Sequence, residues 1–186
     1  DQNGITHLLE HMAFKGTATR SAREIAEEIE AVGGELNAAT SVEHTNYHAR
    51  VLAEDVPLAV DMISDILQNS VFDEEELARE KHVILQELGA AHDTPDDKVF
   101  DQFQETAWAR QAIGRPILGT RETVMSFTPD DLRTYLADHY RADNMVLAAA
   151  GAVDHDALVE LARDRFSGLS SKASPELAPA HYTGGT

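Results

Sequence analysis

The chain is 186 residues long and carries a formal net charge of −18, with 42% hydrophobic residues and no Cys. This length suits one domain with a substantial core, and no apolar run approaches the length of a membrane span. The negative charge argues against a nucleic-acid backbone or an anionic membrane as partner, whereas an acidic surface can attract basic peptides. The absence of Cys excludes thiolate metal ligands, disulfide bonds and a Cys nucleophile.

The first predicted element is a helix over residues 4–12, with the sequence GITHLLEHM. His7 and His11 are four residues apart, so a helix projects both imidazoles from one face, where they can bind one ion. Glu10 lies beside them and can reach a water molecule without being a ligand. The order H-x-x-E-H is the inverzincin signature and predicts a zinc-binding helix, with a structural role of the two His as the alternative.

Capping patterns and apolar spacing predict the elements that follow. Ser21 and Glu24 form a capping box, and short-period alternation on either side of residues 41–43 indicates a β-hairpin. The expected helices are 21–32, 56–68, 73–88, 94–108, one beginning at 120, 128–140 and 154–166; the expected strands are 36–40, 45–52 and a buried strand at 145–150.

These elements predict an α+β fold with a small, mainly antiparallel sheet that is covered by helices on one face. We expect the domain to span residues 1–167, followed by a linker over 168–186 toward a second domain. Three strands form a small platform for so many helices, so we also expect further strands ahead of Asp1.

A third metal ligand is expected from the acidic helix that begins at Asp73, because a catalytic zinc needs three protein ligands and one open position. Glu80 and Glu87 are seven residues apart and share a helix face, and Glu87 lies beside an apolar run. The acids at 74–76 lie in the first turn, where the helix dipole alone explains them. Glu80 and Glu87 are therefore both candidates on spacing alone.

Four stretches carry a resemblance to a known family: HLLEHMAFKGT, GGELNAATSVEHTNYHARV, KHVILQE and IGRPILGT. Together they resemble the pitrilysin/insulinase-type (inverzincin) zinc metallopeptidases, and most of all the processing-peptidase branch, which includes the β subunit of the mitochondrial processing peptidase and bacterial relatives. The likeness extends from about Asp1 to Gly151. It implies the catalytic half of such an enzyme, without its first strands and without the second, homologous domain or subunit that closes over the substrate.

The resemblance also implies roles for individual residues. Glu87 would be the third zinc ligand beside His7 and His11, and Glu80 would steady one of the His from outside the ligand set. One Zn²⁺ would then activate water for peptide hydrolysis, with Glu10 as general base.

Substrate contacts follow from the same resemblance. The residues Asn37, Ala38 and Ala39 would belong to an edge strand that pairs with an extended peptide, and Phe14 would form a wall of the pocket after the cleaved bond. On the helix after Thr94, Asp97 and Asp101 would receive a basic side chain, although ordinary helix capping also explains two acids there. For Phe14 the alternative is an ordinary core position.

The conclusion from the sequence is a zinc endopeptidase that hydrolyses peptides or presequence-like segments. The alternatives are a catalytically silent subunit of the same fold and a peptide-binding module without activity. The remaining His are expected to be structural or exposed: His44, His48, His82, His92, His139, His155 and His181. The compartment stays open between the bacterial cytoplasm or periplasm, which the short loops favour, and the mitochondrial matrix.

Overall fold

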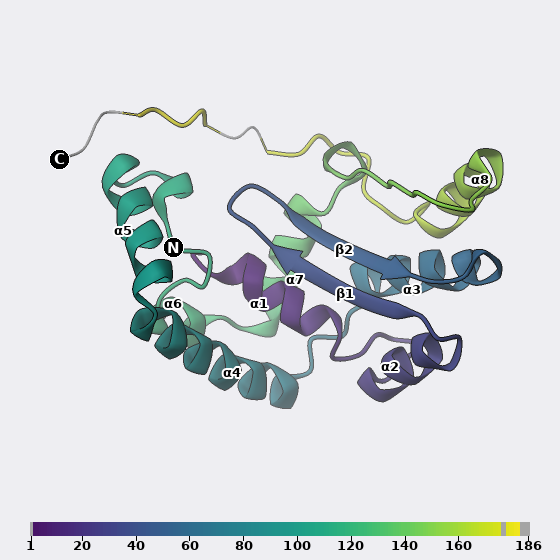
Figure 1. Cartoon of the computed structure of the whole chain (residues 1–186), viewed down its shortest axis with the longest axis horizontal. Coiled ribbons are helices and arrows are strands. Elements are labelled where there is room, and N and C mark those ends of the chain that lie inside the picture. Colours follow the sequence, from purple (N-terminus) through teal and green to yellow (C-terminus); the bar gives the residue numbers. More distant parts are fainter. Residues whose placement is uncertain (1, 176–177, 183–186) are drawn as a thin grey trace.

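A computed structural model describes residues 2–175 and 178–182 of the chain (Figure 1). Two parts of the predicted linker, 176–177 and 183–186, lie outside the described residues. The helices are α1 (Ile5–Ala13), α2 (Ala22–Ala31), α3 (Val56–Gln68), α4 (Glu74–Asp93), α5 (Pro95–Ala107), α6 (Arg121–Ser126), α7 (Pro129–His139) and α8 (His155–Arg165). Among them, none combines the length with the apolar character that crossing a membrane requires.

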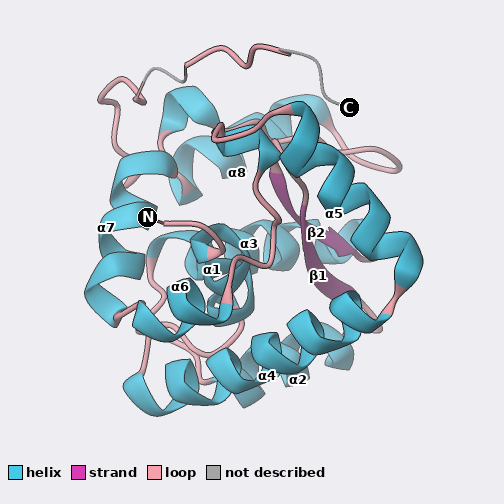
Figure 2. Ribbon diagram, turned by 90° about the vertical axis from the view of Figure 1, so that its left-hand side faces the viewer, coloured by secondary structure: helices cyan, strands magenta, loops and turns pink. Residues whose placement is uncertain are grey.

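The sheet is a two-stranded antiparallel hairpin of β1 (Glu35–Thr40) and β2 (Thr45–Arg50). Its register pairs Glu35 with Arg50 at one end and Thr40 with Thr45 beside the turn. Helices α1, α2 and α3 contact the hairpin, and Figure 2 shows how small the strands are beside the surrounding helices. The α+β class and the antiparallel sheet are thereby confirmed.

The predicted buried strand at 145–150 is wrong. The segment is not assigned to a strand, and Val146 is 93% exposed. A strand needs a neighbour for its backbone N–H and C=O groups, and within the described residues no strand pairs with this segment. The apolar run therefore predicted neither the secondary structure nor the burial of this segment, because both depend on its neighbours.

Helix starts agree well with the predicted caps. Ser21 and Glu24 form the expected reciprocal capping box, and the Asp73 carboxylate accepts from the backbone N–H of residues 75 and 76. Thr120 and Thr128 each cap a further helix. The ends agree less well, since α4 continues to Asp93, five residues beyond the predicted end.

The interior forms two apolar clusters that meet along α1. The first joins α1 to α4, α6 and α7, and its buried members are Ile5, Leu8, Leu9, Met12, Phe72, Leu77, Ile84, Val124, Phe127 and Leu132. The second joins the end of α1 to α2 and α3 through Ala13, Ile25, Ile29, Met62, Ile66 and Leu67, and the partly buried Leu36 and Tyr47 of the hairpin pack against it. Because α1 contributes to both clusters, its position is determined from two sides.

A buried hydrogen-bond and ion-pair network joins the loop between α1 and α2 to α3. Asp65 on α3 is 5% exposed and accepts hydrogen bonds from Thr17, Thr19 and Asn69 as well as from Arg20, at 2.9 Å. These hydrogen bonds outweigh the desolvation of the carboxyl group, so the pKa of Asp65 is lowered. The network fixes the turn that follows α1.

Candidate metal centre

Helix α1 presents His7 and His11 on the face opposite to its apolar stripe. The stripe residues Ile5, Leu8, Leu9 and Met12 are at most 1% exposed, so the helix cannot rotate without losing core contacts. The two imidazole side chains are 14% and 18% exposed, and their ring centroids are 4.6 Å apart. The predicted helix and the common face of the two His are therefore present.

Helix α4 brings Glu87 to the two imidazoles. Its Oε2 atom lies 3.7 Å from Nε2 of His7 and 3.8 Å from Nε2 of His11. This oxygen is buried and has no hydrogen-bond partner in the described structure. A buried carboxylate oxygen that faces two imidazole nitrogens at these distances is expected to bind a cation rather than to remain unpaired.

The donor set fits a zinc ion. One carboxylate and two imidazoles are the ligands of a known class of catalytic zinc sites, and zinc bonds of about 2.0–2.1 Å set the ligand atoms roughly 3.3 Å apart. The ligand atoms of His7, His11 and Glu87 lie within 4.8 Å of one another, and this is the one group of potential ligands found among the described residues. Binding would require only a small contraction of the site.

Glu80 lies outside the group of potential ligands and contacts one of them, His11. Its Oε2 atom is 2.9 Å from Nδ1 of His11, while its Oε1 atom is 2.7 Å from Nζ of Lys15. A hydrogen bond from Nδ1–H leaves Nε2 of His11 as the unprotonated atom that can bind metal. Desolvation opposes ionisation of this carboxyl, but the hydrogen bonds from Lys15 and His11 outweigh it and lower the pKa of Glu80.

His7 is in a different environment from His11. Its Nδ1 atom is buried without a hydrogen-bond partner in the described structure. Burial lowers the pKa of His7, and the neighbouring His11 adds to this effect, while Glu87 opposes it. The lowered pKa favours the neutral imidazole that metal binding requires.

Glu10 lies outside the group of potential ligands, as expected for a base. The hydroxyl group of Thr40, at the end of β1, donates a hydrogen bond to Oε2 of Glu10. Thr40 also lies 3.3 Å from the hydroxyl of Thr45 on the paired strand. The contact of Thr40 could not be predicted from the sequence, because nothing in the spacing of a strand residue shows that it meets a helix residue 30 positions earlier.

The residues predicted for substrate contact lie in three places: on β1, at the end of α1 and on α5. Asn37, Ala38 and Ala39 are in β1, whose outer edge has no partner among the described strands. Phe14 is half-buried and packs at a ring distance of 6.5 Å from Tyr47 of β2, so it has a structural contact in addition to any role toward substrate.

Asp97 and Asp101 lie on α5, and the structure does not place them in the group of potential metal ligands. Burial raises the pKa of Asp101, and the nearby carboxylate of Asp97 adds to the shift. The same helix exposes Phe100 and Phe103. In Figure 1, α5 stands at the same end of the molecule as the beginning of α1. An acidic and aromatic surface of this kind suits a basic side chain.

The other histidines do not approach the candidate metal centre as ligands. His44 bonds the hydroxyl of Ser41 in the hairpin turn, at 3.0 Å, and His139 stacks on Tyr135, with ring centroids 4.2 Å apart. Nδ1 of His82 lies 2.7 Å from the carbonyl oxygen of residue 78, which is in its own helix. These contacts agree with the structural or exposed positions that we expected.

The start of α1 depends on a contact between two glycine backbones. Gly4 has a φ of 89° and Gly119 has a φ of 75°. A Cβ atom on Gly4 would lie 2.9 Å from the Cα of Gly119, and one on Gly119 would lie 2.6 Å from the carbonyl oxygen of Asn3. Only glycine tolerates both the conformation and the close approach, so the loop ending at Gly119 fixes where the metal helix begins.

The sequence matches known protein families along most of its length. Residues 1–121 match the insulinase family (peptidase family M16), and residues 126–185 match the domain described as the peptidase M16 inactive domain. A zinc protease of Rickettsia felis is 46% identical over 185 residues, which cover 100% of this chain and 45% of that protein. A probable β subunit of the mitochondrial-processing peptidase from Arabidopsis thaliana is 46% identical over 99% of this chain and 36% of its own length.

Solved structures share the fold. A protease from Helicobacter pylori superposes with a TM-score of 0.88 at 24% identity, over 95% of this chain and 44% of that one. The first half of the periplasmic protease PqqL from Escherichia coli gives a TM-score of 0.84, over 98% of this chain and 40% of that one. The chain thus spans less than half the length of the curated relatives named above.

Proposed function

Because the chain belongs to the insulinase family of peptidases (M16), we propose that it forms the zinc-binding catalytic part of an endopeptidase. His7, His11 and Glu87 are the proposed ligands of one Zn²⁺. The observation that supports this assignment most strongly is the buried Oε2 atom of Glu87, which has no hydrogen-bond partner among the described residues and faces Nε2 of both imidazoles. When bound, zinc would polarise the scissile carbonyl and make water acidic enough to lose a proton near neutral pH.

Glu10 is the proposed general base. Its carboxylate takes a proton from the attacking water while the C–O bond forms, and it gives that proton to the amine nitrogen as the C–N bond breaks. Thr40 restricts the Glu10 side chain through its hydrogen bond, and Glu80 holds the ring of His11. No acyl-enzyme is formed, since water itself is the nucleophile.

The proposed substrate is an extended peptide that lies beside β1 and pairs with its free edge through Asn37, Ala38 and Ala39. Phe14 would border the position after the cleaved bond, and Asp97 with Asp101 would bind a basic side chain. The net charge of −18 also attracts basic peptides. A homologous domain or subunit would enclose the substrate, and we propose 1–167 as the catalytic domain.

The substitution Glu10→Gln tests this function. It keeps the size of the side chain but removes its ability to accept a proton, so we expect hydrolysis of a basic peptide library to fall about 10²–10⁴-fold with one zinc still bound. Glu30→Gln, an exposed acid on α2, is the matched control and should hydrolyse normally.

Three outcomes are informative. A protein that binds zinc and peptide but cleaves nothing in either form would support the silent subunit or the peptide-binding module instead. Equal cleavage by Glu10→Gln and the unchanged protein would exclude Glu10 as the base. Loss of zinc in Glu10→Gln would place Glu10 among the ligands, contrary to its position outside the cluster.

A further inference from the structure

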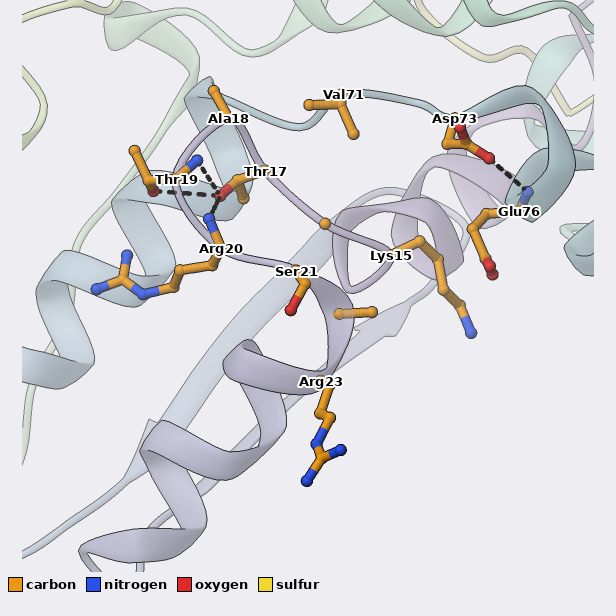
Figure 3. A pocket seen from close by; sticks show the side chains of 12 residues that line it. Lys15, Thr17, Ala18, Thr19, Arg20, Ser21, Arg23, Val71, Asp73 and Glu76 are labelled. Carbon is orange, nitrogen blue, oxygen red and sulfur yellow. Dashed lines mark hydrogen bonds between the residues drawn. The ribbon is translucent and has the colours of Figure 1, made fainter.

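A chain of three side chains leads away from the candidate metal position. It begins at His11, passes through Glu80 on α4, and ends at Lys15 in the turn after α1. Figure 3 shows Lys15 among the residues that line a shallow pocket between this turn and the beginning of α4, where Val71, Asp73 and Glu76 also lie. The ammonium group of Lys15 is thus the outermost member of the chain.

We propose that Lys15 is a positioning residue for the metal centre: through its ion pair with Glu80, it fixes the orientation of His11. The inference rests on the proposed function, because it takes His11 as a zinc ligand. Lys15 is not expected to contact either the metal or the substrate. Its effect reaches the metal only through the Glu80 carboxylate.

The burial of Glu80 is the first support. Its side chain is 8% exposed, and a carboxylate at such a depth needs partners for both oxygens. Lys15 binds Oε1 and His11 binds Oε2, so each oxygen has one partner. Within the described part of the chain, Lys15 is the only Lys or Arg paired with this carboxylate. Without it, one oxygen would be buried and left without its cation.

The geometry of the pair is the second support. Because each of the two oxygens of Glu80 is bound by a different side chain, the plane of the carboxylate is fixed rather than free to rotate. A fixed carboxylate accepts the Nδ1–H bond of His11 in one direction, and this selects both the tautomer and the angle of the imidazole ring. In the part of the chain that the structure describes, His7 has no such partner at its Nδ1 atom, so orientation by hydrogen bonding acts there on only one of the two His.

Zinc affinity measured by competition with a chelator tests the inference without relying on peptide hydrolysis. Substitution of residues that orient metal ligands lowers metal affinity about 10–100-fold. We expect Lys15→Met to weaken zinc binding about tenfold, and Lys15→Arg to restore it because the guanidinium keeps the charge. Arg79→Met is the matched control: Arg79 forms an exposed ion pair with acids of the same helix α4, and its loss should leave zinc affinity unchanged.

A double-mutant cycle with Glu80→Gln separates positioning from a general loss of stability. If Lys15 acts through Glu80, Lys15→Met should have no further effect on zinc affinity once Glu80 is replaced. A full tenfold loss in the Glu80→Gln background would overturn the inference, as would normal zinc affinity in Lys15→Met. If the unsubstituted protein itself fails to bind zinc, the proposed function fails instead, so the two failures are distinguishable.

Discussion

The pair of helices that carries the candidate metal ligands differs sharply from the elements expected to contact substrate. On α1 the apolar residues are almost completely inaccessible, and on α4 Leu77, Glu80 and Ile84 are buried. The hairpin alternates between exposed and half-buried positions and contains no fully buried residue, and α5 buries only Ala107. The helix pair α1 and α4 is therefore packed like a core, while the hairpin and α5 are largely accessible to solvent.

This difference assigns separate tasks to the two regions. A metal site must hold its ligands within a fraction of an ångström, and only close packing with supporting hydrogen bonds provides this. A peptide-binding surface must instead present unpaired backbone groups and accessible charges, which a buried element cannot do. Substitutions in the helix pair should therefore affect stability and metal binding, and those on the open side should affect substrate affinity.

Leu8→Ala should produce the largest loss of stability. Leu8 is 0% exposed and lies one position after His7 in the first apolar cluster. Its truncation leaves a cavity, and we expect the free energy of unfolding to fall by about 3 kcal/mol in denaturant titrations. Val99→Ala on α5, where the side chain is 55% exposed, should change it by less than about 0.5 kcal/mol. Equal losses of unfolding free energy in the two variants would contradict the distinction between the packed helix pair and the accessible elements.

Asp65→Asn should have the next largest effect, with a distinct dependence on pH. We expect a loss of about 2 kcal/mol near neutral pH, because several hydrogen bonds to a buried carboxylate are weakened. Since the pKa of Asp65 is lowered by folding, its stabilisation is fully present above the ordinary value of 3.8 and is lost as the pH falls through the folded value.

Unfolding measured between neutral pH and pH 3 checks this. The difference between Asp65→Asn and the unsubstituted protein should shrink as the pH falls. A difference that stays constant over the whole range would show that the charge of Asp65 contributes nothing.

The smallest predicted effect is on the open side of the molecule. Replacing Asp97 and Asp101 together by Asn should leave unfolding almost unchanged but raise KM for peptides with a basic residue about tenfold, equivalent to about 1.4 kcal/mol. The comparison with uncharged peptides is the internal control, and Glu105→Gln on the same helix is the matched variant. An equal change for basic and uncharged peptides would contradict a charge-recognition role.

Local signals in the sequence predicted most of the helices. The capping box at Ser21 and the cap at Asp73 set two helix starts, and the spacing of His7 and His11 set the face on which they meet. Each of these depends on residues within one or two turns of each other, where backbone geometry leaves little choice. The start of α1 was predicted to within one residue, although its position also depends on a contact with Gly119 that no local signal shows.

Contacts between distant elements could not be predicted from spacing alone. Helical periodicity left Glu80 and Glu87 as equal candidates, and the likeness to a known family was needed to choose between them. Thr40 and Lys15 reach their carboxylates across separate elements, so neither carries a periodic signal. The error at 145–150 has the same origin, because the burial of a strand depends on its neighbours rather than on its own residues.

Anomalous X-ray diffraction at the zinc edge, from crystals of the zinc-loaded protein, tests the central proposal most directly. We predict one strong peak bonded to Nε2 of His7, Nε2 of His11 and a carboxylate oxygen of Glu87, at about 2.0–2.1 Å from each atom. A peak bound elsewhere, or a peak on the two histidines with Glu87 turned away to solvent, would contradict it.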